Sequence, residues 1–540
     1  MEPRRKHLAA IIAALYFSVG AVASAGARDA GDAAQLGKVH FKVECNAAAQ
    51  KEFDLAMAYY HSFAWEQYKA PLERTLQADP GCGMAHWLRA LGTLDNPFVW
   101  PANLSPKIMA EGAAALEAAR STGLKSQRER DYVEALATFY KDYDKLNHPT
   151  RTKALESALE QVAQRYPEDT EASILYALIL SRNFDPQDKK YTNQLKATRI
   201  LEPIFLKQPE HPGVAHYLVH SYDYPPIAQQ GLEAARRYSK IAPGAAHALH
   251  MPSHIFTRVG YWKDSVESNR ASANSAKASI PNWVHALDYM VYAHLQMGQE
   301  RAASEALAES RRIGKYADNF AVAYGMAAMP GRMALERGAW QEAASLQIFP
   351  APDAYPWNKH PQAVALNAFA RGVGAAGIKD VAAAQAEVKR LRELRDAAAA
   401  LKFGYWVEQI DIQAEVVRGL SACAEGKHAE GIEILGKAAA REDATEKHAV
   451  TPGLLVPARE ALAQSILSFA QASDALREFE AVLVREPNRY RATLGAAQAA
   501  DKAGERKKAA FFYGQLLQLA KNADTPRAEL TEAKRYLGTM

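Results

Sequence analysis

Half of the histidines of this chain lie in one stretch, residues 211–294, although the chain has 540 residues and 16 histidines in all. His216 and His220 are four residues apart, and so are His250 and His254, which places each pair on one face of a helix. The second pair therefore repeats the first at a fixed interval along the chain. Imidazole is a common ligand of zinc and related ions, so this spacing indicates a metal site.

Three interpretations of these histidines stay open. The first is a metal site, with zinc as the first expectation and copper as the second, in which three protein ligands leave a position for water or substrate. The second is a polar groove that binds a peptide or a small anion. The third is a set of buried histidines whose ring nitrogens pair with backbone carbonyls and aspartates.

Each interpretation names particular residues. The expected metal ligands are His216, His220, His250 and His254. Further ligands, or residues that orient the ligands, would be His247, His285, Asp223 and Asp288. The groove contacts would be Tyr222, Arg258 and Tyr289.

A proline interrupts the same stretch, since Pro252 stands between His250 and His254. Proline inside a helix costs roughly 3 kcal/mol because it removes a backbone hydrogen bond. Either a helix begins at Pro252, where proline is tolerated, or the helix is kinked there. A broken local rule beside histidines is typical of a functional site.

Pairs of helices are expected to position these side chains. Several segments end in a proline and have small or apolar residues twelve, eight and five positions before it. These spacings place the small or apolar residues on one face of a helix. Gly231, Ala235 and Tyr238 stand at these distances before Pro243. Pro209 ends another such segment, and it precedes Pro243 by the same interval that relates the two histidine pairs. Because no stretch alternates apolar and polar residues convincingly, the sequence predicts an all-α fold.

These repeats resemble the tetratricopeptide repeat (TPR) family, whose repeat length is about 34 residues. The interval from Pro209 to Pro243 agrees with this length. The best match, near the C-terminus, comprises Ala475, Phe479, Val482, Pro487, Leu494, Gly495, Ala509 and Tyr513. The chain also resembles exported bacterial TPR proteins with a HMPSHIF-type segment, here residues 250–256. The resemblance implies a superhelical solenoid of helix-turn-helix units that binds a protein or peptide partner in its concave groove.

The chain is expected to divide into two arrays. Residues 40–345 would form an N-terminal TPR-like array that carries the histidine-rich groove, and residues 362–540 a C-terminal array. A proline-rich loop, residues 346–361, would separate them, and a second interruption is expected at residues 442–457.

The N-terminus has the pattern of an export signal. Arg4, Arg5 and Lys6 precede a short apolar run, and small residues end at Ala25. Residues 1–25 would be a cleaved signal peptide, which predicts an exported protein, periplasmic or secreted. The apolar run is too short for a stable membrane anchor. The formal charge of +4, from 65 basic and 61 acidic residues, is too balanced to indicate nucleic-acid binding.

The chain has three cysteines, Cys45, Cys82 and Cys423. In an exported protein Cys45 and Cys82 are candidates for a disulfide, since they fall in neighbouring helical segments; three buried thiols are the alternative. The function expected from the sequence is an exported TPR-type scaffold that binds a protein or peptide, with a histidine-coordinated metal. The alternative is a metal-dependent, hydrolase-like enzyme that uses the histidines of residues 216–288, with unidentified catalytic residues.

Overall fold

A computed structural model of the chain describes residues 35–101, 104–277 and 279–538, and all regular structure within these ranges is helical. The predicted signal peptide lies outside the described residues. The first part contains α2 (Ala47–His61), α3 (Lys69–Ala78), α4 (Gly83–Thr93), η1 (Pro97–Val99), α5 (Pro106–Ser121), α6 (Gln127–Tyr140), α7 (His148–Arg165), α8 (Thr170–Arg182) and α9 (Thr192–Lys207).

The middle of the chain carries the histidine-rich stretch and continues to the proline-rich loop. It contains α10 (Pro212–Tyr222), η2 (Ala228–Gly231), α11 (Leu232–Ile241), α12 (Ala246–His250), α13 (Pro252–Arg258), α14 (Trp262–Ser275), α15 (Ile280–Gln296), α16 (Glu300–Arg311), α17 (Phe320–Glu336), α18 (Trp340–Ala344) and η3 (Trp357–Lys359). The last part contains α19 (Pro361–Gly377), α20 (Val381–Ala400), α21 (Gly404–Ala424), α22 (His428–Asp443), α23 (Ala458–Phe469), α24 (Ala472–Arg485), α25 (Tyr490–Lys502), α26 (Arg506–Leu519) and α27 (Ala528–Gly538).

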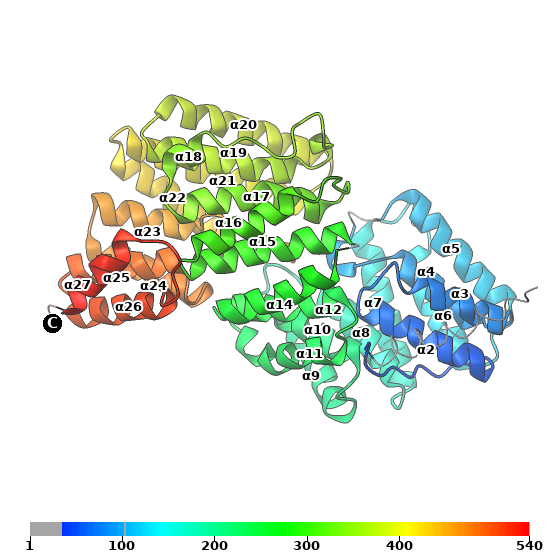
Figure 1. Ribbon diagram of the computed structural model, residues 1–540. Helices are drawn as coiled ribbons and strands as arrows, with labels where there is room; N and C mark the ends of the chain where they lie inside the picture. Colours follow the sequence, from blue (N-terminus) through cyan, green and yellow to red (C-terminus); the bar gives the residue numbers. More distant parts are fainter. Residues whose placement is uncertain (1–34, 102–103, 278, 539–540) are drawn as a thin grey trace, which may run out of the picture.

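Successive helices pack as antiparallel hairpins that stack along the chain, so the predicted all-α superhelical solenoid is confirmed (Figure 1). Local sequence sets the helix starts. Ser105 accepts a hydrogen bond from the N–H of Ile108 and is followed by Pro106, and Asn147 accepts one from the N–H of Thr150. Such N-caps satisfy backbone donors that the helix itself leaves unpaired.

The repeat register continues through the histidine-rich hairpins. Helices α10, α12 and α15 begin at Pro212, Ala246 and Ile280, at equal intervals that match the interval between the two histidine pairs. Helix α12 ends at His250 and α13 begins at Pro252, so the proline occupies the first position of a new helix. The hairpin's first helix nevertheless starts in register at Ala246 and is interrupted at Met251, so the structure combines the two predicted accommodations: a break in the helix, with Pro252 in the first turn of the part that follows.

The C-terminal helices fold back onto the middle of the chain, so that α25 contacts α15. The indole N–H of Trp262 donates to the carbonyl of Asn488 at 2.8 Å, and the Asn488 amide donates to the carbonyl of Gly260 at 3.2 Å. The side chain of Gln296 accepts from the backbone N–H of Tyr490 at 2.8 Å. These contacts join residues that lie far apart in the sequence, and they close the solenoid on itself.

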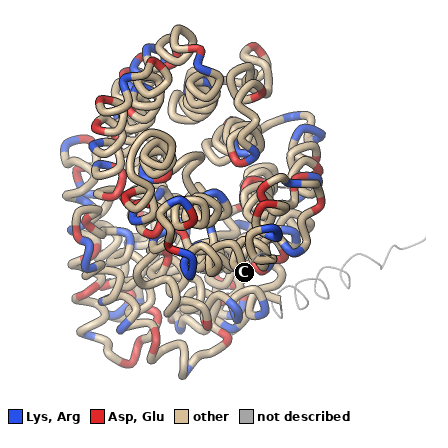
Figure 2. Tube along the Cα trace, turned by 90° about the vertical axis from the view of Figure 1, so that its left-hand side faces the viewer, with Lys and Arg blue, Asp and Glu red and all other residues tan. Residues whose placement is uncertain are grey.

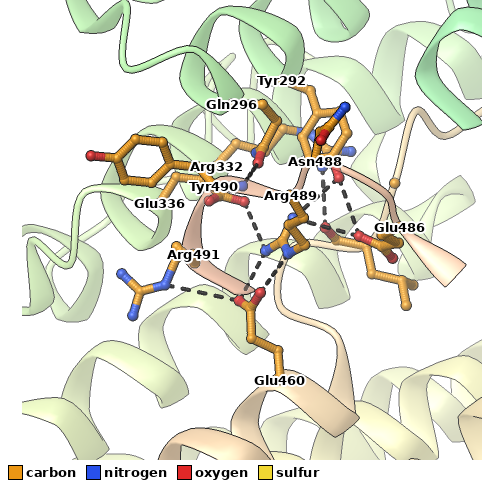
Figure 3. Close-up of polar contacts among 12 residues, drawn as sticks. Tyr292, Gln296, Arg332, Glu336, Glu460, Glu486, Asn488, Arg489, Tyr490 and Arg491 are labelled. Carbon is orange, nitrogen blue, oxygen red and sulfur yellow. Dashed lines mark hydrogen bonds and ion pairs between the residues drawn. The ribbon is translucent and has the colours of Figure 1, made fainter. Parts of the chain in front are cut away.

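A buried arginine lies at the centre of this closure (Figure 3). The side chain of Arg489 is fully buried, and its guanidinium donates to both carboxylate oxygens of Glu460, at 2.6 and 3.1 Å. It also lies 2.8 Å from Glu336 of α17 and donates to the hydroxyl of Tyr292 of α15 at 3.1 Å. Arg489 thus ties α23 and α25 to α15 and α17.

The two interruptions expected from the sequence are connectors between helices. Residues 346–360 join α18 to α19, and the indole of Trp357 donates to the carbonyl of Pro350 within this loop. Residues 444–457 join α22 to α23 and reach across to the first half of the chain, where Glu446 lies 2.7 Å from Lys189 and accepts from the hydroxyl of Tyr191.

Charged residues of both signs are mixed along the helices rather than separated into patches (Figure 2). Among the described residues, no helix is both long and apolar enough to span a bilayer.

The arginine at the closure predicts a large stability effect. Arg489→Met would leave the buried carboxylates of Glu336 and Glu460 without their cation, and we expect a loss of about 3–5 kcal/mol of unfolding free energy. Arg477→Met is the matched control because Arg477 is 70% exposed and pairs with Asp474 on its own helix; we expect a change below about 1 kcal/mol. Urea denaturation measures both, and equal midpoints would contradict the role of Arg489.

The structure joins Cys45 and Cys82 by a disulfide between the starts of α2 and α4, with the two Cα atoms 5.2 Å apart, and leaves Cys423 as a buried thiol. We predict that protein unfolded without reductant takes up one equivalent of iodoacetamide, and that reduction first raises this to three. Mass spectrometry measures the uptake, and three equivalents without reductant would rule out the disulfide.

Candidate metal centre

Six imidazoles from consecutive hairpins converge inside the solenoid. They belong to α10, to the α12–α13 pair and to α15, which lie side by side as the register requires. The residues are His216, His220, His247, His250, His254 and His285. Four of them are buried, with at most 7% of their surface exposed, and His247 and His285 are partly buried.

The imidazoles form two groups of three. In the first triad, His216, His220 and His247, one ring nitrogen of each residue lies within 4.8 Å of the others. The second triad, His250, His254 and His285, meets the same condition. The four histidines expected as ligands are therefore shared between two triads, each completed by one of the two histidines that were expected in a supporting role.

The second triad has a defined hydrogen-bond shell. Nδ1 of His250 lies 2.6 Å from Oδ1 of Asn269, and Nδ1 of His254 lies 2.9 Å from Oδ2 of Asp223. The Asn269 amide nitrogen donates to the carbonyl of Ser265, which leaves its oxygen to face His250. Both partners are acceptors, so each Nδ1 carries the proton and donates it.

This shell determines what the other ring nitrogens can do. A neutral imidazole has one N–H, so Nε2 of His250 and Nε2 of His254 both carry lone pairs. These two atoms lie 3.0 Å apart. Two lone pairs that face each other at hydrogen-bond distance repel unless a proton or a metal ion lies between them. The second triad therefore has the electronic arrangement of a cation site.

Asp223 connects this site to the second half of the chain. Its carboxylate accepts from the Arg258 guanidinium at 2.8 Å and from the Lys447 ammonium at 3.2 Å, in addition to His254. Although burial opposes ionisation, Lys447 and Arg258 hold the pKa of the Asp223 carboxyl well below its usual range. Burial lowers the pKa of Lys447 to about 8. Asp223 stays ionised and acts as the acceptor for His254.

Burial also keeps the imidazoles neutral, which is the form that binds metal. Desolvation lowers the pKa of His250 to about 3, and the neighbouring His254 acts in the same direction. The pKa values of His216, His220, His247 and His285 lie well below the usual range for the same reason. The pKa of His254 is lowered by burial, against the opposing effect of Asp223.

The first triad has one ring of fixed orientation. Nδ1 of His216 donates to the carbonyl of His61 at 2.7 Å, so its Nε2 carries a lone pair and lies 3.2 Å from Nε2 of His247. Nε2 of His220 is buried and has no hydrogen-bond partner among the described residues. The His220 ring stacks on Phe98, with 3.9 Å between ring centroids, which holds it in place.

The other residues named from the sequence take different positions. Asp288 lies in register with His254 but pairs with Arg332 of α17 at 2.9 Å, and it belongs to neither triad. The hydroxyl of Tyr222 donates to Glu202, on α9. Tyr289 lies beside the second triad, where its hydroxyl is 3.5 Å from Nε2 of His254 and donates to the carbonyl of Thr451 at 3.2 Å. Arg258 contacts Asp223, as described above.

A third group of potential ligands, His61, Glu171 and His211, lies nearby. Each oxygen of the Glu171 carboxylate faces one imidazole, at 3.0 Å from Nε2 of His61 and 2.8 Å from Nε2 of His211. Nδ1 of His61 lies 2.9 Å from the hydroxyl of Tyr217. Because its carboxylate oxygens already have imidazole partners, this group is explained by hydrogen bonding alone.

The segment that joins α22 to α23 lies beside the second triad. Lys447 donates to Asp223, and the carbonyl of Thr451 accepts from Tyr289. A polar pocket is lined by Arg258, Lys447 and Glu446, among others, and none of the six histidines is among the described residues that line it. Four of the six histidines are buried and two are partly exposed, so most of the histidine face is interior.

Sequence reasoning missed several residues that support the triads. Asn269 lies on α14, Lys447 lies in the second half of the chain, and the carbonyl of His61 is a backbone group. The repeat spacing does not predict any of these three groups. Each belongs to an element that packs against the histidine-bearing helices, outside the positions that the repeat relates. Only the tertiary fold brings them to the site.

No protein-family model and no curated protein matches the chain. Among the solved structures that match is the crystal structure of the P58(IPK) TPR domain, which is 10% identical over 91% of this chain and 99% of that chain, with a TM-score of 0.22. A likeness this remote carries no argument, so the site must be interpreted from its own geometry.

The buried imidazoles predict sensitivity to acid in metal-free protein. Below pH 6.5, the ordinary pKa of histidine, His250 takes up a proton in the unfolded chain but stays neutral in the folded chain. Acidification therefore stabilises the unfolded state. The contribution of His250 to folding stability is complete above pH 6.5 and falls as the pH is lowered. Between pH 7 and pH 5 the loss for one such group is about 2 kcal/mol.

Between pH 7 and pH 5, we expect the unfolding free energy of the His250→Gln variant to fall by about 2 kcal/mol less than that of the unsubstituted protein. Urea denaturation at both pH values in the presence of a chelator measures the difference. His40→Gln serves as the control because the His40 side chain is 70% exposed. Identical losses in the His250 variant and the unsubstituted protein would show that His250 is not held neutral.

Proposed function

We propose that this helical-repeat protein binds a transition-metal ion at the second triad, through Nε2 of His250, His254 and His285. The observation that carries the proposal is the 3.0 Å separation of two Nε2 atoms whose rings both donate from Nδ1. A metal ion between them would turn a repulsive contact into two coordination bonds.

The dimensions support the proposal. Ligand nitrogens at about 2.0–2.1 Å from a tetrahedral zinc ion are roughly 3.3 Å from one another. The two Nε2 atoms at 3.0 Å are close to this value, and the third imidazole is within 4.8 Å. Small ring rotations would complete the set. Three imidazoles without thiolate or carboxylate suit zinc first and copper second.

The surrounding residues resemble those around ligating histidines generally. A ligating histidine usually donates its second N–H to a carboxylate or carbonyl oxygen, which fixes the ring and raises its basicity. Asp223 fills this role for His254, and Asn269 fills it for His250. An ionised Asp223 also offsets part of the charge that the ion would bring.

A metal-dependent hydrolase is the second candidate. Three protein ligands leave a fourth position for water, and the hydroxyl of Tyr289 lies 3.5 Å from Nε2 of His254, on one side of the triad. Catalysis would require a substrate to pass the covering segment at Lys447 and Thr451. The closed interior therefore favours metal binding as the function, with hydrolysis dependent on movement of that segment.

A protein or peptide partner remains part of the proposal because helical-repeat solenoids commonly bind partners on extended surfaces. His250 and His254 are buried, and Lys447 and Thr451 lie beside them through Asp223 and Tyr289, so we expect a partner to contact a different surface. Export also remains part of the proposal. It rests on the pattern of residues 1–25, and the disulfide between Cys45 and Cys82 suits an oxidising compartment.

Elemental analysis tests the metal site directly. Protein purified without a histidine tag is expected to carry at least one equivalent of zinc or copper, and His250→Ala combined with His254→Ala is expected to lose the ion of the second triad. The control, His40→Ala with His428→Ala, alters two histidines outside both triads and should keep the full content.

Stability provides a second readout in case the double variant folds poorly. An ion that binds only the folded state raises the free energy of unfolding, and with it the urea midpoint. When the free ion concentration is a hundred times the dissociation constant, the gain is about 2.7 kcal/mol. His250→Gln alone should abolish most of this gain. Protein that contains no metal and is indifferent to chelator and to added zinc or copper would refute the proposal.

A further inference from the structure

We infer that the chain holds a second ion one repeat earlier, at the first triad, so that two ions share the interior of the solenoid. This inference rests on the proposed function of the second triad. Its own evidence is the repeat register, the orientation of the rings in the first triad and the distance between the triads.

The second triad is the first triad moved along by one repeat. His250 follows His216 by one repeat length, and His254 follows His220 by the same interval. The third members of the two triads, His247 and His285, are separated by more than one repeat length, and the excess is about one helical turn. The same pair of helix positions, completed by a histidine from the next hairpin, thus occurs twice.

Ring orientation in the first triad suits an ion as well. His216 directs a lone pair at His247 across 3.2 Å because the carbonyl of His61 holds its Nδ1 proton. Nε2 of His220 is buried, has no hydrogen-bond partner in the part of the chain that the structure describes, and belongs to a residue that is 7% exposed. An unpaired buried nitrogen is costly in a folded protein, and a metal ion would provide its missing partner.

The two triads are immediate neighbours. The ring centroids of His220 and His254 are 6.1 Å apart, and those of His247 and His250 are 6.2 Å apart. Since these pairs join one triad to the other, the two ions would be close neighbours. The site would be a two-ion centre rather than two independent sites.

Charge limits which ions can fill both positions. Six neutral imidazoles contribute no negative charge, and Asp223 already faces Arg258 and Lys447. At a given separation, two divalent ions repel each other four times as strongly as two monovalent ions. Copper(I) is monovalent and binds imidazole, so double occupancy is expected with copper(I) more readily than with zinc.

Metal stoichiometry tests the inference. The variant Cys423→Ser, which removes the free thiol as a competing ligand, would be loaded in parallel with copper(I) under anaerobic ascorbate and with zinc, then desalted and analysed for metal. We expect two copper ions per chain. One copper ion per chain, whatever the zinc content, would overturn the second site and leave the proposed function intact, whereas no bound ion of either metal would overturn both.

Paired variants locate the two ions. His216→Gln with His220→Gln should reduce copper from two to one, and so should His250→Gln with His254→Gln. The matched control is His211→Gln, from the third group, which should retain two ions. Loss of one ion in the control, or retention of two in the first-triad variant, would place the second ion elsewhere and overturn the inference. Circular dichroism identifies any variant that fails to fold, and single His220→Gln then replaces the pair.

Discussion

The arrangement of the interior depends on one constraint, which is that buried imidazoles must give their protons to fixed acceptors. Each acceptor comes from a different element: the carbonyl of His61 ends α2, Asn269 lies on α14, and Asp223 follows α10. Packing of these elements against the histidine-bearing helices therefore determines which ring nitrogen is free. In His216, His250 and His254 the free nitrogen is Nε2, and these three atoms contribute to the two triads.

The same acceptors also link the two halves of the chain. A buried, ionised Asp223 needs cationic partners, and Lys447 supplies one of these from the segment after α22. That segment is anchored by Glu446 to Lys189 and Tyr191 and, further along, by the helices that Arg489 ties to α15 and α17. Buried ion pairs of this kind contribute modestly to net stability but are costly to break, so they define one arrangement of the two halves.

Much of the fold could be predicted because it is local and periodic. Proline-terminated helices, the regular spacing of the repeats and an interruption at Pro252 all follow from neighbouring residues. The division of the six histidines into two triads could not be predicted from the repeat. The position one repeat after His247 is not a histidine, and His285 lies one helical turn beyond it. Asp288 shows the opposite case: it keeps the register of His254, yet α17 places Arg332 against it and removes it from the site. Register predicts position along the solenoid, whereas the partner of a side chain depends on the element that packs across it.

The closed interior also bears on what kind of ligand the histidines serve. A peptide groove needs exposed donors and acceptors that a partner can satisfy, whereas here Thr451 and Lys447 already occupy that face. Among the described residues, the ring nitrogens left unsatisfied at the triads include Nε2 of His220 and the opposed pair of His250 and His254. Each unpaired buried polar group costs roughly 1–3 kcal/mol. A small cation is the ligand that fits this space and removes that cost, and since it would bind only the folded chain, its binding free energy would stabilise the fold itself.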